Sequence, residues 1–300
     1  MNDRAALELA LAANPDDFAT HAAYADLLIE QGDPRGDYVR LQLALEDRQQ
    51  PLERLRAMEQ EAFELSQRHE AAWLGPLAGH VNVVAWGNPR GTSVEVRRPN
   101  VEFTMRRGWL NEVRVRNLSG EVQDALVACP IARLVSDLAV QGGSLVTRRV
   151  LEALPNLTRL SCENPLDERA APATTGAWFH PVAERPLSNL LVGLLPRLRH
   201  LTLRTPACGD DGVARLIGSG LLDGLRGLDL CNCAITDDGA QALAGHPAVA
   251  RLDYLHLDGN HISPVGIDAL AAVGVVISQR QYLGPTPGAD LDAADGEIAF

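Results

Sequence analysis

The sequence contains no lysine: all 27 of its basic residues are arginine, against 39 aspartates and glutamates. Because arginine replaces lysine at most solvated positions without disturbing a fold, a GC-rich, arginine-biased genome accounts for this, and selection against lysine-directed modification is the alternative. The formal net charge of -12 argues against a nucleic-acid binder, since such proteins neutralise phosphates with a concentrated basic face.

Long apolar runs and a regular cysteine pattern are also missing. No segment approaches the ~20 apolar residues that a membrane-spanning helix requires. The beginning, "MNDRAALELALAANPDD", lacks the basic region and apolar core of a secretory signal. The cysteines are odd in number and scattered, which does not fit a disulfide framework. We therefore expect a reduced, cytoplasmic protein that does not bind a membrane. The cysteines are Cys129, Cys162, Cys208, Cys231 and Cys233.

Residues 1–75 show helical periodicity. Apolar residues recur at helical spacing from Ala5 to about His69 in four groups, which predicts four helices. The segments "ANPDD" and "GDPRGD" separate the first three groups, because proline, glycine and aspartate end or begin helices. We expect an all-helical segment here.

Beyond Pro76 the sequence alternates in β fashion and then repeats. The pattern LxxLxL begins at Leu198 and returns after 27 residues, at Leu225 and again at Leu252. Three weaker copies begin at Leu110, Val135 and Leu157, which makes six. The array is expected to occupy residues 76–283, with a loop insertion near 163–190 and an acidic, flexible tail at 284–300.

These copies resemble leucine-rich repeats, and their length is most similar to the ribonuclease-inhibitor-like branch. The resemblance implies an α/β solenoid: a curved parallel sheet lines the concave side and helices cover the convex side. The pattern agrees, because the leucines of LxL face one side of a strand and "AQALA" or "IDALA" can return as a helix over them.

The N-terminal segment carries a second resemblance. The residues "YADLLIEQGDPRGDYVRLQ", 24–42, look like the bacterial repeat-companion domain, with Leu27 in place of its usual tryptophan. The segment "FTMRRGWLNEVRV", 103–115, resembles the connection between that domain and its repeats. Neither family implies a catalytic activity. Because the first repeat of a solenoid exposes an apolar end, we expect the helices to cap it; an independent function is the alternative.

The stretch "LDYLHLDGNHI", 252–262, contains two histidines and two aspartates, which raises the question whether the repeats hold a reactive site. Alternation along a strand sends Leu255 and Leu257 into the core and His256 and Asp258 outward. Asn260 falls at the position where this repeat family keeps Asn or Cys to hydrogen-bond the backbone of the turn. His261 follows that turn, so its side chain should diverge from His256, and a metal site shared by the two histidines is disfavoured. We expect no metal and no cofactor.

A cysteine-based site is the competing hypothesis. The register places Asp229 beside His256 and an exposed Cys231 beside Asp258, with Cys233 buried at the position of Asn260. A hydrolase would use Cys231 as nucleophile, His256 as base and Asp229 to orient it. The same register supplies no oxyanion hole, so we favour a protein without catalytic activity.

The outward positions of the repeats form the candidate surface for a protein partner. A loop in the insertion, with Trp178 and Phe179, is a second candidate, although these rings could instead pin the loop to the solenoid. We expect a protein-binding or regulatory role, as an adaptor, inhibitor or immunity protein that is monomeric when free. A GTPase regulator is an alternative function. The opposing interpretation is that the outward positions form only a solvated sheet face. The concave-face candidates are Arg114, Arg116, Arg159, Arg204, Asp229, Tyr254, His256 and Asp258.

Overall fold

The computed structural model describes residues 3–47, 49–81, 85–87, 94–96, 100–141, 146–163, 195–204 and 208–274. The predicted loop site at Trp178 and Phe179, the tail at 284–300 and the end of the array beyond residue 274 lie outside these residues. Within the described part of the chain, no helix is both long enough and apolar enough to span a bilayer.

Helices fill the N-terminal segment, and four of them stand where the apolar spacing predicts them. A 3-10 turn, Gly75–Leu77, and a short helix α5, Ala78–Val81, follow them. The four helices are α1, Asp3–Ala13; α2, Phe18–Glu30; α3, Arg35–Leu45; and α4, Leu52–Leu74.

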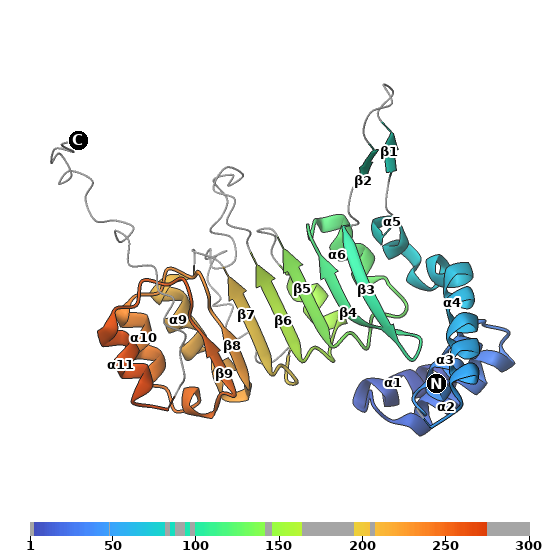
Figure 1. The fold of residues 1–300 in the computed structure, drawn as a ribbon, viewed down its shortest axis with the longest axis horizontal. Helices are drawn as coiled ribbons and strands as arrows, with labels where there is room; N and C mark the ends of the chain where they lie inside the picture. The colour runs from blue at the N-terminus through green and yellow to red at the C-terminus, as the bar shows by residue number, and fades with distance from the viewer. Residues whose placement is uncertain are drawn as a thin grey trace.

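A seven-stranded sheet follows the helices (Figure 1). Its strands lie in chain order; β3 is antiparallel to β4, and all later neighbours are parallel. Strands β1, Ala85–Gly87, and β2, Val94–Val96, pair separately as a hairpin. The sheet comprises β3, Val101–Arg106; β4, Trp109–Val115; β5, Asp137–Gln141; β6, Arg159–Glu163; β7, His200–Arg204; β8, Gly227–Asp229; and β9, Tyr254–His256.

Each parallel connection that is fully described returns through helical turns on one side of the sheet (Figure 1). We call the other side, which carries Tyr254 and His256, the open face. The helices of the covered side are α6, Gly120–Val127; α7, Arg148–Ala153; α9, Gly209–Gly218; α10, Asp237–Ala244; and α11, Pro264–Ala271. Short 3-10 turns at Leu221–Gly224 and Val249–Arg251 lead into β8 and β9.

The strand register confirms the six predicted copies. Their central apolar residues pair rung by rung across the sheet, and all six are buried. The wide spacing between the third and fourth copies does not interrupt the sheet, because β6 pairs directly with β7. These residues are Val113, Leu138, Leu160, Leu201, Leu228 and Leu255.

The predicted backbone role of Asn260 is also confirmed. Its side-chain oxygen accepts from the backbone N–H groups of Cys233, at 2.9 Å, and Ile235, at 3.0 Å. Its side-chain nitrogen donates to the carbonyls of Leu230 and Leu257. Cys233, one repeat earlier, is buried and donates its thiol to the Leu203 carbonyl. Both side chains satisfy buried backbone groups where the chain leaves its strand.

Aspartates tie successive helices together, which explains the repeated glycines 239 and 266. Asp210 accepts from the Thr236 backbone N–H and hydroxyl, and from the Gly239 N–H at 3.1 Å. Asp237 accepts from the backbone N–H and the hydroxyl of Ser263, and a Cβ at Gly266 would stand 2.6 Å from its carboxylate. A Cβ at Gly239 would stand 2.3 Å from the Asp210 carboxylate, so only glycine permits this approach.

The helical segment packs against the β3–β4 end of the sheet. Tyr24 on α2 stacks on Trp109 on β4 with ring centroids 5.4 Å apart. Arg107, in the β3–β4 turn, donates to both carboxylate oxygens of Glu46 at 2.6 and 2.7 Å. One buried apolar cluster runs from Leu11 in α1 to Leu270 in α11. The helices and the repeats therefore share a core.

Candidate binding surface

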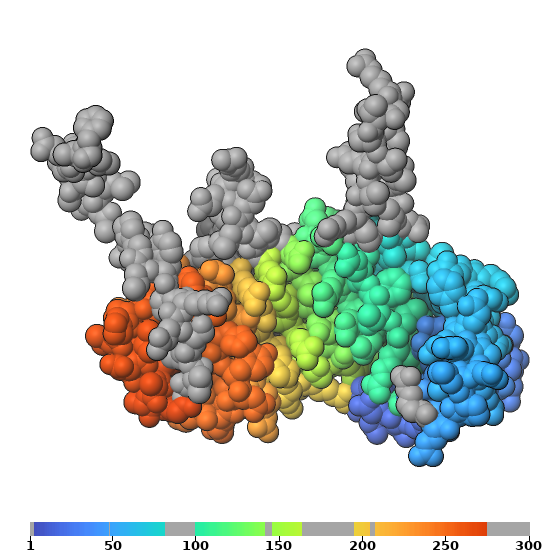
Figure 2. Space-filling model, in the orientation of Figure 1, coloured from blue at the N-terminus to red at the C-terminus, as the bar shows by residue number. Residues whose placement is uncertain are grey.

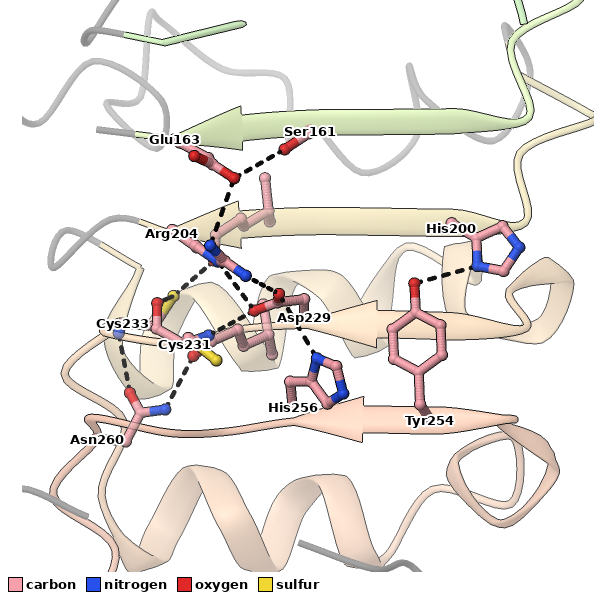
Figure 3. A network of polar contacts seen from close by, with 12 residues as sticks. Ser161, Glu163, His200, Arg204, Asp229, Cys231, Cys233, Tyr254, His256 and Asn260 are labelled. Carbon is pink, nitrogen blue, oxygen red and sulfur yellow. Dashed lines mark hydrogen bonds and ion pairs between the residues drawn. The ribbon is translucent and has the colours of Figure 1, made fainter. Parts of the chain in front are cut away.

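Tyr254 forms the centre of an aromatic cluster on the open face (Figure 3). Its ring extends over Gly227 on the neighbouring strand, where a Cβ would stand 2.2 Å from the Tyr254 ring. The ring stacks on His200, two strands away, with centroids 5.8 Å apart and planes 12° apart. The His200 Nδ1 lies 3.2 Å from the Tyr254 hydroxyl, and the His256 ring centroid lies 4.8 Å from the Tyr254 centroid. Tyr254 can occupy this position because Gly227 has no side chain.

A second cluster surrounds Asp229, beside the aromatic one. Arg204 on β7 donates to Asp229 on β8 at 2.6 Å and approaches Glu163 on β6 at 3.5 Å. The Nδ1 of His256 lies 3.7 Å from the same carboxylate (Figure 3). Asp229 points toward the open face as the register predicts, but only 6% of its side chain is exposed, so the prediction that it is an exposed contact residue is wrong. Arg204 and His256, from the strands on either side, are far more exposed than the carboxylate between them.

The ionisation of Asp229 follows from these contacts. Burial by itself raises the pKa of this carboxyl group, but the hydrogen bonds from Arg204 and from the Cys231 backbone N–H outweigh burial, so its pKa lies below the ordinary value. Asp229 is therefore a buried anion that holds Arg204 in place. Burial, followed by the charge of Arg159, lowers the pKa of His200, and burial raises the pKa of the Tyr254 hydroxyl.

The structure does not support the cysteine hydrolase. Cys231 is buried, contrary to the predicted exposure, with 8% of its surface accessible. Burial and a hydrogen bond to Asp229 raise the pKa of its thiol to about 12. A nucleophilic cysteine needs a depressed pKa, because the thiolate is the reactive form. Asp229, His256 and Cys231 are neighbours as predicted, but Asp229 contacts the thiol directly and opposes its ionisation.

The remaining predicted contact residues differ in their exposure. Arg114 on β4 is exposed, and Asp258, which follows β9, is half-buried with its Oδ1 atom buried. Arg116 pairs with Glu102 at 2.7 Å, and Arg159 pairs with Asp137 at 2.9 Å. Because Arg116 and Arg159 have acidic partners on adjacent strands, their charges are compensated locally.

Sequence reasoning missed Gly227 and gave His200 no special role. The available signal was a glycine at an outward strand position, because such a glycine often marks a close approach by another group. The approaching group is Tyr254, which is the register partner of Gly227 on the next strand.

A family model described as a leucine-rich repeat matches residues 225–244 and 252–271, which cover the segments from β8 to α10 and from β9 to α11. Among solved structures, a crystal structure of a protein from Bacteroides fragilis is similar, at 21% sequence identity and a TM-score of 0.36. That similarity covers 51% of this chain and 44% of the other, so the aligned part spans less than half of the relative. No curated protein matches the chain.

Proposed function

We propose that this chain, which carries leucine-rich repeats, is a binding module that recognises a protein partner through the open face of its sheet. Leucine-rich repeats generally mediate protein–protein interaction, and repeat proteins use their extended sheet surfaces for this purpose. Within this class we favour a cytoplasmic adaptor, inhibitor or immunity protein. We further propose that the helices α1–α4 act as a companion domain that caps the first repeat.

The observation that carries the proposal is the position of Tyr254 over Gly227. Tyrosine and arginine are enriched among the residues that dominate binding energy, because each supplies a large contact area together with a polar group. His200 and His256 flank the tyrosine ring, and Asp229 fixes Arg204. A side chain that is already ordered loses less conformational entropy when a partner binds, so both are suited to anchor an interface.

The test compares partner capture by three baits from the native host. The first is the wild-type protein, and the second carries Tyr254→Ala and His256→Ala. The third carries Gln241→Ala and Asp268→Ala, two exposed positions on α10 and α11 of the covered side. We expect one protein to be retained by the first and third baits and lost from the second. Equal capture by all three would contradict recognition through the open face.

The captured protein must then bind directly. Purified partner and wild-type chain should form a complex by calorimetry, and the Tyr254→Ala/His256→Ala protein should bind at least about 100-fold more weakly, since hot-spot truncations cost about 2 kcal/mol or more each. Both variants should melt within a few degrees of the wild type, because the substituted side chains are wholly or partly exposed.

A further inference from the structure

A cavity of about 350 Å³, lined by both polar and apolar side chains, lies between the helical segment and the N-terminal ends of β5 and β6. The α1–α2 connection, the β3–β4 turn and Arg197 contribute to its wall. We propose that this cavity binds a small hydroxylated oxyanion, such as a sugar phosphate or a polyhydroxy carboxylate. The proposal is independent of the open face and concerns a different part of the molecule.

Positive charge in the cavity wall is only partly compensated. Arg106, Arg107 and Arg197 all line the cavity. Arg106 donates to Asp16 at 2.8 Å, and Arg107 is neutralised by its two bonds to Glu46. Arg197 differs from both, because its partners among the described residues are neutral: the Ala13 carbonyl and the Asn156 side-chain oxygen. A planar guanidinium with unused N–H groups fits a carboxylate or phosphate.

Arg197 also bridges the two halves of the wall. It comes from the segment before β7, yet it contacts the end of α1, 184 residues earlier in the chain. Figure 2 shows this yellow segment meeting the blue N-terminal helices along the lower edge of the molecule. An anion bound to Arg197 would therefore lie close to where the helical segment and the repeats meet.

The part of the lining that precedes β5 and β6 offers acceptors, which favours hydroxyl groups on the ligand. The hydroxyl of Ser136 donates to Asn111, and that of Thr158 donates to the Ser136 carbonyl at 3.1 Å. Each hydroxyl has thus used its one hydrogen and retains lone pairs. Both residues line the cavity, so a ligand hydroxyl can donate to either of them.

His21, in the helical part of the lining, holds a buried acceptor. Its Nε2 lies 2.8 Å from the Pro15 carbonyl, which can only accept, so Nε2 carries the hydrogen. Burial, with Arg107 and Arg106 nearby, lowers the pKa of His21 and keeps the ring neutral. The lone pair therefore resides on Nδ1, which has no hydrogen-bond partner among the described residues. Trp109, which also lines the cavity, has a buried Nε1–H with no acceptor among the described residues, so two buried polar atoms of the lining residues lack a hydrogen-bond partner in that part of the chain.

The test is calorimetric titration of the whole chain at constant ionic strength with four probes: glucose 6-phosphate, gluconate, inorganic phosphate and glucose. We expect saturable binding of glucose 6-phosphate or gluconate, weaker binding of inorganic phosphate and none of glucose. The two hydroxylated anions distinguish a phosphate ligand from a carboxylate ligand. Absence of saturable binding for all three anions would overturn the proposal.

Three variants assign the binding to this cavity. Arg197→Gln should weaken the affinity by about tenfold or more, because it removes charged donors. Asp16→Asn should tighten it, since Arg106 then loses its competing carboxylate. Arg226→Gln, an exposed arginine outside this cavity, should leave it unchanged. Equal affinity in the wild type and all three variants would refute the site, and Asp16→Asn keeps the test decisive if Arg197→Gln does not fold.

Discussion

Tyr254 on β9 lies over Gly227 on β8, and a Cβ added at Gly227 would stand 2.2 Å from the tyrosine ring. Parallel neighbours on one sheet face normally place two side chains side by side. Here one of the two is absent, and the other extends across its position to reach His200 on β7. The aromatic cluster of the open face therefore depends on a glycine.

Gly227→Ala should displace Tyr254 and destabilise the fold by about 1–3 kcal/mol, the usual cost of inserting a methyl group into a filled space. Urea unfolding measures this change. The matched control is the same substitution in a Tyr254→Ala background, where the space is vacant and the cost should vanish. An equal loss in both backgrounds would show that the tyrosine ring is not the obstacle.

Core and open-face substitutions should differ sharply in cost. Leu228→Ala and Leu255→Ala each remove a buried rung, so each should lower the free energy of unfolding by about 2–5 kcal/mol. His256→Ala, on an exposed side chain of the same strand as Leu255, should change it by less than about 1 kcal/mol. Similar costs at positions 255 and 256 would refute the register.

Asp229 should make stability depend on pH. Its pKa is lowered in the folded state, so its contribution is present above the unfolded pKa of about 3.9 and is lost as the pH falls through the lower folded value. Asp229→Asn should therefore be less stable than the wild type at pH 7, and the difference should narrow below about pH 4. Parallel stability curves from pH 7 to pH 2 would contradict this assignment.

The helix ties predict a large effect at one aspartate and a small one at another. Asp210→Ala leaves two backbone N–H groups and the Thr236 hydroxyl without their acceptor, and should cost about 1–3 kcal/mol. Asp238→Ala removes an exposed carboxylate from the start of α10, the helix whose first turn Asp210 contacts, and should cost about 0.5 kcal/mol or less. Thermal or urea unfolding distinguishes these outcomes.

Cys231 should react slowly with iodoacetamide at pH 8, because its thiol is buried and its pKa is raised to about 12. Labelling followed by peptide mapping measures the rate at this cysteine, and the urea-unfolded chain gives the rate for an accessible thiol. Labelling of the folded protein as fast as that of the unfolded chain at pH 8 would show an accessible, ionisable thiol and would favour the hydrolase.

The repeat could be predicted from the sequence, because core residues that stack from one copy to the next recur at a regular spacing. Leucines 27 residues apart became paired rungs of the sheet, and Asn260 and Cys233 took equivalent positions at the strand ends. These features depend on alternation along each strand and on the stacking of copies that follow one another in the chain, so both are visible in the sequence. The helical spacing of the first 75 residues likewise identified four helices.

The surroundings of each outward residue depend on how distant segments pack. Alternation gives the direction of a Cβ but not the side chains that cover it, so Asp229 and Cys231 were expected to be exposed and are buried. The position of Tyr254 depends on the absence of a side chain at Gly227 in the adjacent strand. The arginine-lined cavity depends on Arg197 contacting Ala13, 184 residues earlier in the chain. Burial and proximity of this kind arise only when distant segments pack together, and a linear pattern does not contain them.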